Sequence, residues 1–226
     1  MKRLRVLALA AAIPFCAPGA ALAQHVNSDV PRAGMVEVGA TATWTGGDDL
    51  GTIEAREISN PGVSSNPLTL FRTDAKVKPS VGVEGQIGVY LSRALETEGT
   101  GSFSRPVLSV GVSGDFEGAP DTTAEKTLTN YLIGGAALYH FGRGRLRPFV
   151  FGGAAYLRQI DTDAVAAQNG MELHAGGGLK YWLGRGRRRS ALRLDARISS
   201  RNRSAGFDPM RRATLPMVSA GYALLF

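Results

Sequence analysis

The histidines are the side chains of this chain whose chemistry would be most telling, because histidine can act as a general base or bind a metal ion. The chain has three: His25, His140 and His174. One known type of hydrolase uses a histidine, a serine two residues after it and a nearby glutamate. Here the residue two positions after His140 and His174 is glycine in both cases. No two histidines have the spacing of metal ligands. We therefore expect no enzyme activity, no cofactor and no metal site.

The single cysteine, Cys16, lies in a segment that we expect to be removed. A basic start and a short apolar run over residues 6–15 precede Ala21-Leu22-Ala23, a small-x-small cleavage pattern. These features predict a secretory signal peptide over residues 1–23 and a mature domain over residues 24–226. Without the cysteine, the mature domain would have neither disulfides nor thiol chemistry.

Two short arginine-rich segments are candidates for binding phosphate, because a guanidinium donates two parallel hydrogen bonds to one phosphate group. Each basic residue near an anionic membrane surface is worth about 1 kcal/mol. The hypothesis is contact with phospholipid head groups through Arg143, Arg145, Arg147, Arg185, Arg187, Arg188 and Arg189. A second expected contact, with lipopolysaccharide phosphates, involves Arg201, Arg203, Arg211 and Arg212. A plain solvated rim would carry the same residues.

The rest of the chain favours strands over helices. Glycine is abundant, with 29 of 226 residues, which disfavours long helices. Alternation of apolar and polar residues instead predicts an all-β chain. The eight predicted strands cover residues 35–45, 80–91, 95–104, 128–141, 148–159, 171–183, 191–200 and 216–226. A tilted membrane strand needs about 9–11 residues, and an even number of strands is typical of bacterial barrels.

The connections between the predicted strands alternate between short and long. Residues 92–94, 142–147 and 184–190 are short connections, whereas residues 46–79 and 105–127 are long. Short periplasmic turns and longer external loops are typical of membrane barrels. Turn-forming residues in 46–79 predict a loop, which we expect to contact a surface ligand, because scaffolds place binding in loops.

One of the long connections keeps part of a strand pattern. Leu108, Val110 and Val112 alternate with smaller or polar residues. The third strand is therefore expected to continue beyond the bilayer, with a bulge or a break near Pro106.

The two faces of the predicted barrel differ in kind. The apolar face carries aromatic residues near the strand ends, as in the interfacial girdles of membrane barrels. The expected girdle is Trp44, Phe103, Tyr139, Phe141, Phe149, Tyr181 and Phe226. The other face carries charges of both signs, which can pair within a narrow lumen. The expected lumen network is Glu37, Glu84, Glu96, Glu98, Arg158, Glu172, Lys180, Arg193, Asp195 and Arg197.

The pairing of neighbouring strands sharpens this expectation. Symmetric closure of the last hairpins would put Arg158 opposite Glu172 and Lys180 opposite Asp195, so that opposite charges share a face. We therefore predict lipid outside the barrel and a filled lumen without a wide channel. Leu132 and Leu138 would then point inward, which calls for a partly apolar plug.

The last strand carries a pattern that is unusual at a chain end. Val218, Ala220, Tyr222, Leu224 and Phe226 share one face, and the last of them is the terminal residue. This pattern resembles the C-terminal assembly signal of bacterial outer-membrane β-barrels. The resemblance implies recognition by the barrel-assembly machinery.

Three further segments carry a wider resemblance: residues 147–154 (RPFVFGGA), 176–182 (GGGLKYW) and 193–197 (RLDAR). With Phe226, they resemble the outer membrane protein β-barrel domain family, whose small members are eight-stranded barrels of the OmpA and OmpX type. The resemblance implies an eight-stranded antiparallel up-and-down transmembrane β-barrel in the cell outer membrane. It specifies a fold and a location, but no activity.

These observations predict a monomeric outer-membrane barrel without catalysis, with an envelope-structural or surface-interaction role through its external loops. Two alternatives stay open. A narrow pore or transport barrel would need lumen charges of one sign, whereas a secreted soluble ligand-binding β-barrel would need an apolar interior. The net charge of +7 does not indicate nucleic-acid binding, because the chain lacks interleaved aromatic and basic residues.

Overall fold

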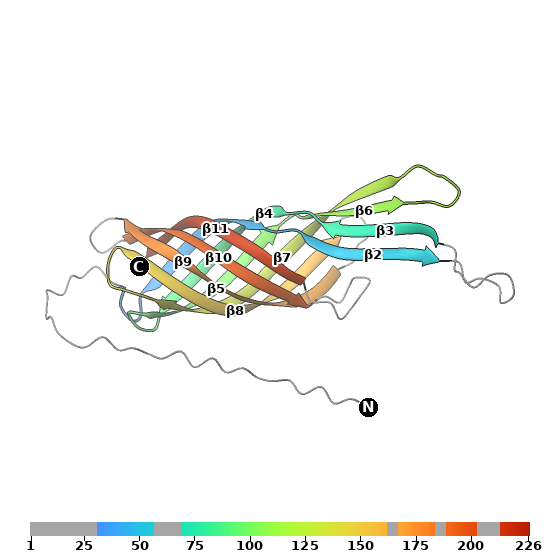
Figure 1. Ribbon diagram of the computed structural model, residues 1–226. Coiled ribbons are helices and arrows are strands. Elements are labelled where there is room, and N and C mark those ends of the chain that lie inside the picture. Colours follow the sequence, from blue (N-terminus) through green and yellow to red (C-terminus); the bar gives the residue numbers. More distant parts are fainter. Residues whose placement is uncertain (1–30, 57–68, 162–166, 184–188, 203–212) are drawn as a thin grey trace, which may run out of the picture.

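Eight antiparallel strands close into a barrel, which confirms the predicted fold class (Figure 1). The computed structural model describes residues 31–56, 69–161, 167–183, 189–202 and 213–226, and the predicted signal peptide lies outside them. Around the barrel the strands are β1 (Val36–Thr45), β4 (Ser80–Tyr90), β5 (Leu95–Ser104), β7 (Thr122–His140), β8 (Leu146–Asp161), β9 (Ala167–Leu183), β10 (Arg189–Asn202) and β11 (Ala213–Leu225). Among these described residues, no helix has the length and apolar character to cross a membrane.

The first and last strands of the barrel pair with each other. Strand β11 lies between β10 and β1, and the backbones of Val36 and Phe226 exchange two hydrogen bonds of 3.1 and 2.8 Å. The carboxyl terminus therefore lies at the same end of the barrel as the tight turn at 91–94 and the turn at 141–145 (Figure 1). We call this end the turn end.

At the opposite end, four strands continue beyond the barrel as a sheet. Strands β2 (Asp48–Arg56), β3 (Thr69–Val77) and β6 (Val107–Ser113) pair in the order β2-β3-β6, and β6 pairs with residues 122–127 of β7 (Figure 1). We call this four-stranded sheet the extension. The prediction that residues 46–79 and 105–127 are loops was therefore wrong for much of their length. The predicted continuation of the third strand is confirmed, because β6 follows β5 after a break at Arg105-Pro106.

Short breaks in three strands separate the extension from the barrel. They fall at Gly46-Gly47, Lys78-Pro79 and Arg105-Pro106. The pairing register changes by one residue at the second break. Val77 pairs with Leu108, and Gly82 pairs with Ser104. Five residue steps separate Val77 from Gly82, whereas only four separate Ser104 from Leu108. One extra residue makes a β-bulge and moves the following side chains to the other face. The alternation of β3 is therefore out of phase with that of β4.

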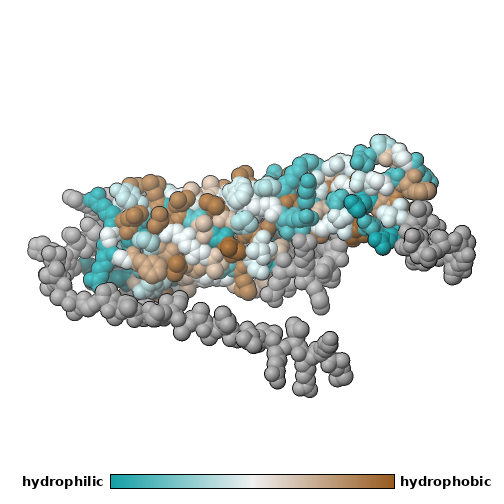
Figure 2. All heavy atoms as spheres, in the orientation of Figure 1, coloured by the Kyte–Doolittle hydropathy of each residue, from teal (hydrophilic) through white to brown (hydrophobic). Residues whose placement is uncertain are grey.

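Apolar side chains cover the outside of the barrel and polar ones fill its inside. Outward-facing Val81, Ile133 and Ile198 are 63–75% exposed, whereas inward-facing Asp195 and Arg197 are 4% and 8% exposed. Figure 2 shows hydrophobic residues over the visible face of the barrel, with hydrophilic residues gathered at the turn end and over the extension. Such an apolar band between polar ends is the surface of a transmembrane barrel.

The narrow barrel needs glycine at inward positions. A Cβ on Gly221 would lie 2.1 Å from the Ala40 carbonyl oxygen and 2.5 Å from Thr41 Cγ2. Outward-facing Gly101 has no atom within 4 Å of that position. Gly221→Ala is therefore expected to lower the free energy of unfolding by about 1–3 kcal/mol through overpacking.

Gly101→Ala serves as the matched control for this prediction, because its added methyl group would point into open space. Urea titration of both variants, folded in vesicles, measures the difference. Equal stability of the two variants would contradict the tight inner packing.

Candidate functional site

The charged interior of the barrel is the site that the fold assembles most completely. Its carboxylates stand mainly on β1, β4 and β5, and its cationic side chains mainly on β9 and β10. These two groups of strands form different walls of the barrel, because β11 separates β10 from β1 and strands β7 and β8 separate β5 from β9. Ion pairs between them therefore cross the lumen.

At the turn end, Lys180 ties two acidic strands together. Its Nζ lies 2.7 Å from Glu37 Oε1 and 2.9 Å from Glu96 Oε2. The Tyr90 hydroxyl donates to the other Glu37 oxygen over 3.0 Å, and His140 Nε2 lies 2.6 Å from Glu96 Oε2. All five residues are almost fully buried.

In the middle of the barrel, Arg193 is the centre of a second group. Its guanidinium forms ion pairs with Glu98 at 2.5 Å and Asp195 at 2.9 Å. The Ser219 hydroxyl donates to the remaining Asp195 oxygen over 2.6 Å. The Phe149 ring lies below the guanidinium, with 5.1 Å between Arg193 Cζ and the ring centroid, which suits a cation–π contact.

Two further ion pairs lie toward the extension. Arg197 binds Glu84 on β4 at 2.5 Å, and Arg201 binds Glu172 on β9 at 2.5 Å. The Ser199 hydroxyl donates to the second Glu172 oxygen over 2.8 Å. The charged groups are thus distributed along the lumen, and they fill its cross-section at several heights.

Nine of the ten residues expected in the lumen lie there, but Arg158 does not. Arg158 is exposed on the outer face of β8, beside Tyr131 of β7 and Asn169 of β9. The expected pairing of Arg158 with Glu172 was therefore wrong. Arg158 lies opposite Asn169 instead, three residues from the expected partner, and an odd shift turns the side chain to the other face of the sheet. Lys180 pairs with Arg193 rather than with Asp195, which is a shift of two residues. The facing carboxylates of Glu37, Glu96 and Glu98 neutralise this cationic wall.

The side of the lumen formed by β7 and β8 is largely apolar between Asn130 and the pair His140 and Arg147. Leu138, Phe149 and Phe151 form one buried cluster, and Leu132 packs with Ala155 and Leu157 in another. These clusters form the partly apolar plug that was expected from the inward positions of Leu132 and Leu138. Phe149, expected in the aromatic girdle, is 2% exposed and belongs to the lumen instead.

The other expected girdle residues face outward. They are 36–59% exposed: Trp44, Phe103, Tyr139, Phe141, Tyr181 and Phe226. The residues of the expected assembly signal also lie on the outer face of β11 and at its end: Val218, Ala220, Tyr222, Leu224 and Phe226. Whether assembly factors recognise them stays a prediction.

The arginines of the two turns do not behave alike. Arg143 and Arg145 are exposed, whereas Arg147 is 1% exposed and donates to the Arg93 carbonyl oxygen over 2.6 Å inside the barrel. The expected head-group contact of Arg147 was therefore wrong. Of the remaining arginines, Arg185, Arg187, Arg188, Arg203, Arg211 and Arg212 and the side chain of Arg189 lie outside the described residues.

Among the described residues, sequence reasoning missed three basic members of the lumen network. His140 stands between the predicted outward residues Tyr139 and Phe141, so the alternation already placed it inside. Arg201 was assigned to lipopolysaccharide, but its position in phase with Arg193 and Arg197 indicates the lumen. Arg147 was assigned to the turn at 142–147, but β8 begins at Leu146, and Arg147 shares the inward phase of Phe149.

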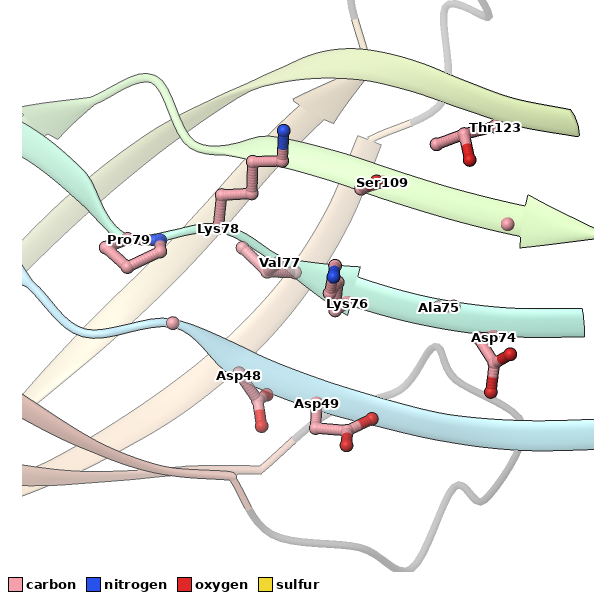
Figure 3. A pocket seen from close by; sticks show the side chains of 12 residues that line it. Asp48, Asp49, Asp74, Ala75, Lys76, Val77, Lys78, Pro79, Ser109 and Thr123 are labelled. Atoms are coloured by element: carbon pink, nitrogen blue, oxygen red, sulfur yellow. The ribbon is translucent and has the colours of Figure 1, made fainter.

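The extension carries a polar hollow of about 630 Å³ at its base. Figure 3 shows Asp48, Asp49 and Asp74 pointing to one side of this view and Lys78 to the other. Lys78 pairs with Glu125 at 2.5 Å, and Asp74 accepts a hydrogen bond from Thr52. Within the described residues, no group of three histidine, cysteine or acidic side chains has a geometry that could hold a metal ion.

Further along the extension, Glu54 lies between two arginines. It accepts hydrogen bonds from Arg56 and from Arg72, both over 2.8 Å. These hydrogen bonds, that from Arg56 first, hold the pKa of Glu54 below its ordinary value. A lowered pKa in the folded state stabilises the fold above the ordinary pKa, and this contribution is lost as pH falls through the lowered pKa.

A carbon-13 titration of the Glu54 carboxyl group is expected to give a midpoint below that of free glutamate. Arg72→Gln should move this midpoint upward, because one guanidinium is lost. The same substitution at exposed Arg143 is the control. A midpoint at the ordinary value in the unmodified protein would contradict the arrangement.

Comparisons with known proteins bear on the fold. No family model matches the chain, and no curated protein matches its sequence. The outer membrane protein OprG of Pseudomonas aeruginosa is similar in structure, with 12% identity, a TM-score of 0.56, and coverage of 88% of this chain and 98% of that chain. The N-terminal β-barrel domain of OprF from the same organism has 17% identity and a TM-score of 0.46, covering 86% and 98%.

Ail of Yersinia pestis, solved with the heparin analogue sucrose octasulfate, has 10% identity and a TM-score of 0.43, covering 84% of this chain and 99% of that chain. At such identities the likeness is one of fold alone, and OprG carries it. Membership in the outer membrane protein β-barrel domain family stays a prediction. The chain thus has the architecture of a small outer-membrane β-barrel.

Proposed function

We propose that the protein is an integral outer-membrane barrel with a closed lumen, which acts without catalysis by holding its extension at the cell surface. In this proposal the turn end faces the periplasm and the extension faces the exterior. The observation that carries it is the series of buried ion pairs that cross the lumen from β9 and β10 to β1, β4 and β5.

Barrel size supports a closed lumen. An eight-stranded barrel encloses only enough space for its own inward side chains. Here that space holds large residues such as Arg147, Tyr90, Phe149 and Lys180, all 0–2% exposed. An ion that crossed the barrel would have to separate several buried ion pairs, each of which would leave an uncompensated charge at considerable cost.

Burial also supports the absence of catalysis. The contact between His140 and Glu96 has the form of a base and its orienting carboxylate, but the side chains of both residues are 0% exposed. Tyr90 and Phe149 lie against the His140 ring, with centroids 5.5 Å away in each case. A substrate therefore has no route to this pair.

The extension is the part of the molecule best placed for a surface role. It carries charged side chains such as Arg56, Arg72 and Glu54 that are exposed or half-buried. The proposed partner class is a surface ligand bound through the region 46–79. The apolar outer face supports a monomer surrounded by lipid, and the pairing of Phe226 with Val36 fits assembly by the barrel machinery.

Planar-bilayer recording tests the closed lumen. The refolded protein is expected to give no stable conductance. A variant with Arg193→Ala, Glu98→Ala, Arg197→Ala and Glu84→Ala removes two crossing ion pairs and is expected to show channel openings, which proves that the assay detects a pore. A large stable conductance of the unmodified protein would overturn the proposal and favour a pore.

Location is tested separately by membrane fractionation and by gel mobility with and without heating. A folded outer-membrane barrel is expected in the outer-membrane fraction, with a shift in mobility on heating. Recovery in the soluble periplasmic fraction would instead favour the secreted ligand-binding barrel.

A further inference from the structure

The outer face of the barrel changes character where the extension begins. Along β7, the outward residues run from Thr127 and Thr129 through Tyr131 to Ile133. Ile133 is 71% exposed and Tyr131 44% exposed. Polar, aromatic and aliphatic residues thus follow one another within a few residues, which is the order expected across the boundary between head groups and hydrocarbon.

Two arginines stand on this boundary. Arg158 is the register neighbour of Tyr131, and Tyr131 packs on Phe103 with 5.4 Å between ring centroids. Arg105 follows Phe103 by two residues and is exposed at the break before Pro106. Both arginines are therefore attached to the backbone next to the pair of rings formed by Phe103 and Tyr131.

We propose that Arg105 and Arg158 bind the phosphate of an anionic lipid in the leaflet that adjoins the extension. The inference rests on the membrane location and orientation proposed above, but it does not depend on a closed lumen. It assigns lipid binding to an arginine that sequence reasoning had placed in the lumen, and takes it away from Arg201, which is bound to Glu172 inside the barrel.

The two arginines can reach one head group. The Leu128 nitrogen donates to the Pro106 carbonyl oxygen over 2.9 Å, so Arg105 lies beside Thr129, and Thr129 pairs with Ile160, two residues after Arg158. Strand spacings of about 4.8 Å and rises of about 3.3 Å per residue give roughly 12 Å between the two Cα atoms. Arginine side chains of ordinary length can close that distance onto a phosphate or a diphosphate.

The charges around the pair favour an anion. Between the two arginines, the outward residues of β7 are the uncharged Thr127 and Thr129. The nearest carboxylate further along that face of β7 is Glu125, which is already paired with Lys78 at 2.5 Å. Within the described residues, neither guanidinium has an ion pair. A phosphate would meet two uncompensated guanidiniums, each able to donate two parallel hydrogen bonds.

The aromatic pair argues for a lipid as the source of the phosphate. Phe103 and Tyr131 give the acyl chains and the upper glycerol or sugar region an apolar support directly below the arginines. A free phosphate would gain nothing from that support. The expected ligand is therefore amphiphilic, with phosphate above and hydrocarbon below.

Native mass spectrometry of the full, detergent-solubilised protein tests the proposal. The probes are bis-phosphorylated lipid A, the same lipid without phosphates, and inorganic phosphate. The protein is expected to retain the phosphorylated lipid and neither of the other two. With about 1 kcal/mol for each basic residue at an anionic surface, R105Q/R158Q should bind about thirtyfold more weakly, and R105K/R158K should recover part of the affinity.

The matched control is R143Q/R145Q, which removes the same charge from exposed arginines at the turn end. Its affinity should equal that of the unmodified protein, and mobility on unheated gels verifies that every variant is folded. Equal binding by R105Q/R158Q and the unmodified protein would overturn the proposal. So would an equal loss in both double variants, which would indicate attraction to net charge, or retention of inorganic phosphate alone.

Discussion

Replacing Arg193 by methionine should lower the free energy of unfolding by about 3–5 kcal/mol, the cost of removing one partner from a buried ion pair. Arg193 holds Glu98 and Asp195 together in the middle of the lumen. Both carboxylates are nearly inaccessible to water, at 5% and 4% exposure. Without the guanidinium they would face each other as two uncompensated charges.

Urea titration of protein folded in vesicles measures this loss. Arg143→Met is the control, because Arg143 is exposed at the turn end, and it should change stability by no more than about 0.5 kcal/mol. Adding Glu98→Gln and Asp195→Asn to Arg193→Met should recover most of the loss, since neutral amides need no counter-charge. If the single variant were as stable as the control, the lumen pairs would not be desolvated as described.

Placing arginine at Ile133 should cost about 1–3 kcal/mol of folding free energy in a bilayer, because the penalty for a cation on the lipid face is about 2–4 kcal/mol at the membrane centre and falls toward the interfaces. Ile133 lies on the outer face of β7, opposite Gly101 on one neighbouring strand and Tyr156 on the other. On the same outer face, Tyr131 at the head-group boundary is two residues away and Tyr139 is six residues away. The new guanidinium would therefore have to extend past the Tyr131 ring to reach the head groups.

Phe116→Arg is the matched control for this substitution. Phe116 is 64% exposed and Ile133 71% exposed, but Phe116 lies at the far end of the extension, next to the start of β3. A cation there should cost almost nothing. Equal effects of the two substitutions, measured by refolding into vesicles, would mean that the apolar outer face is not surrounded by lipid.

The eight barrel strands could be predicted from the sequence because most of them alternate between an apolar lipid face and a polar lumen face, with exceptions on β7 and β8. Strands β2 and β3 escaped prediction because they stand in water, where neither face must be uniformly apolar, whereas the alternation of Leu108, Val110 and Val112 did predict β6. Gly46-Gly47 interrupts the alternation before β2, and Lys78-Pro79 interrupts it after β3, where the bulge puts β3 out of phase with β4. Glycine and proline residues that end a strand cannot be distinguished, in a single sequence, from those that only interrupt a strand that then continues.

The lumen residues were predictable where charge marked the inner face, and not where it was absent. In β10, Arg193, Asp195 and Arg197 repeat at every second position and fix the inward phase. In β8, apolar residues stand on both faces, because the lumen is apolar along β7 and β8. Arg158 and Phe149 were therefore assigned to the wrong sides. Strand register was equally undetermined, because the length of a connection does not reveal how it closes.

The ion pairs that cross the lumen have a consequence for how the barrel is assembled in the membrane. The carboxylates of these pairs come from the first half of the polypeptide, and their cationic partners come from its last quarter: Glu37, Glu84, Glu96 and Glu98 against Lys180, Arg193 and Arg197. A nascent half-cylinder would thus present unmatched carboxylates until the late strands arrived to neutralise them. Insertion and sealing of the seam between Val36 and Phe226 should therefore be a single concerted event, without a long-lived partly inserted species.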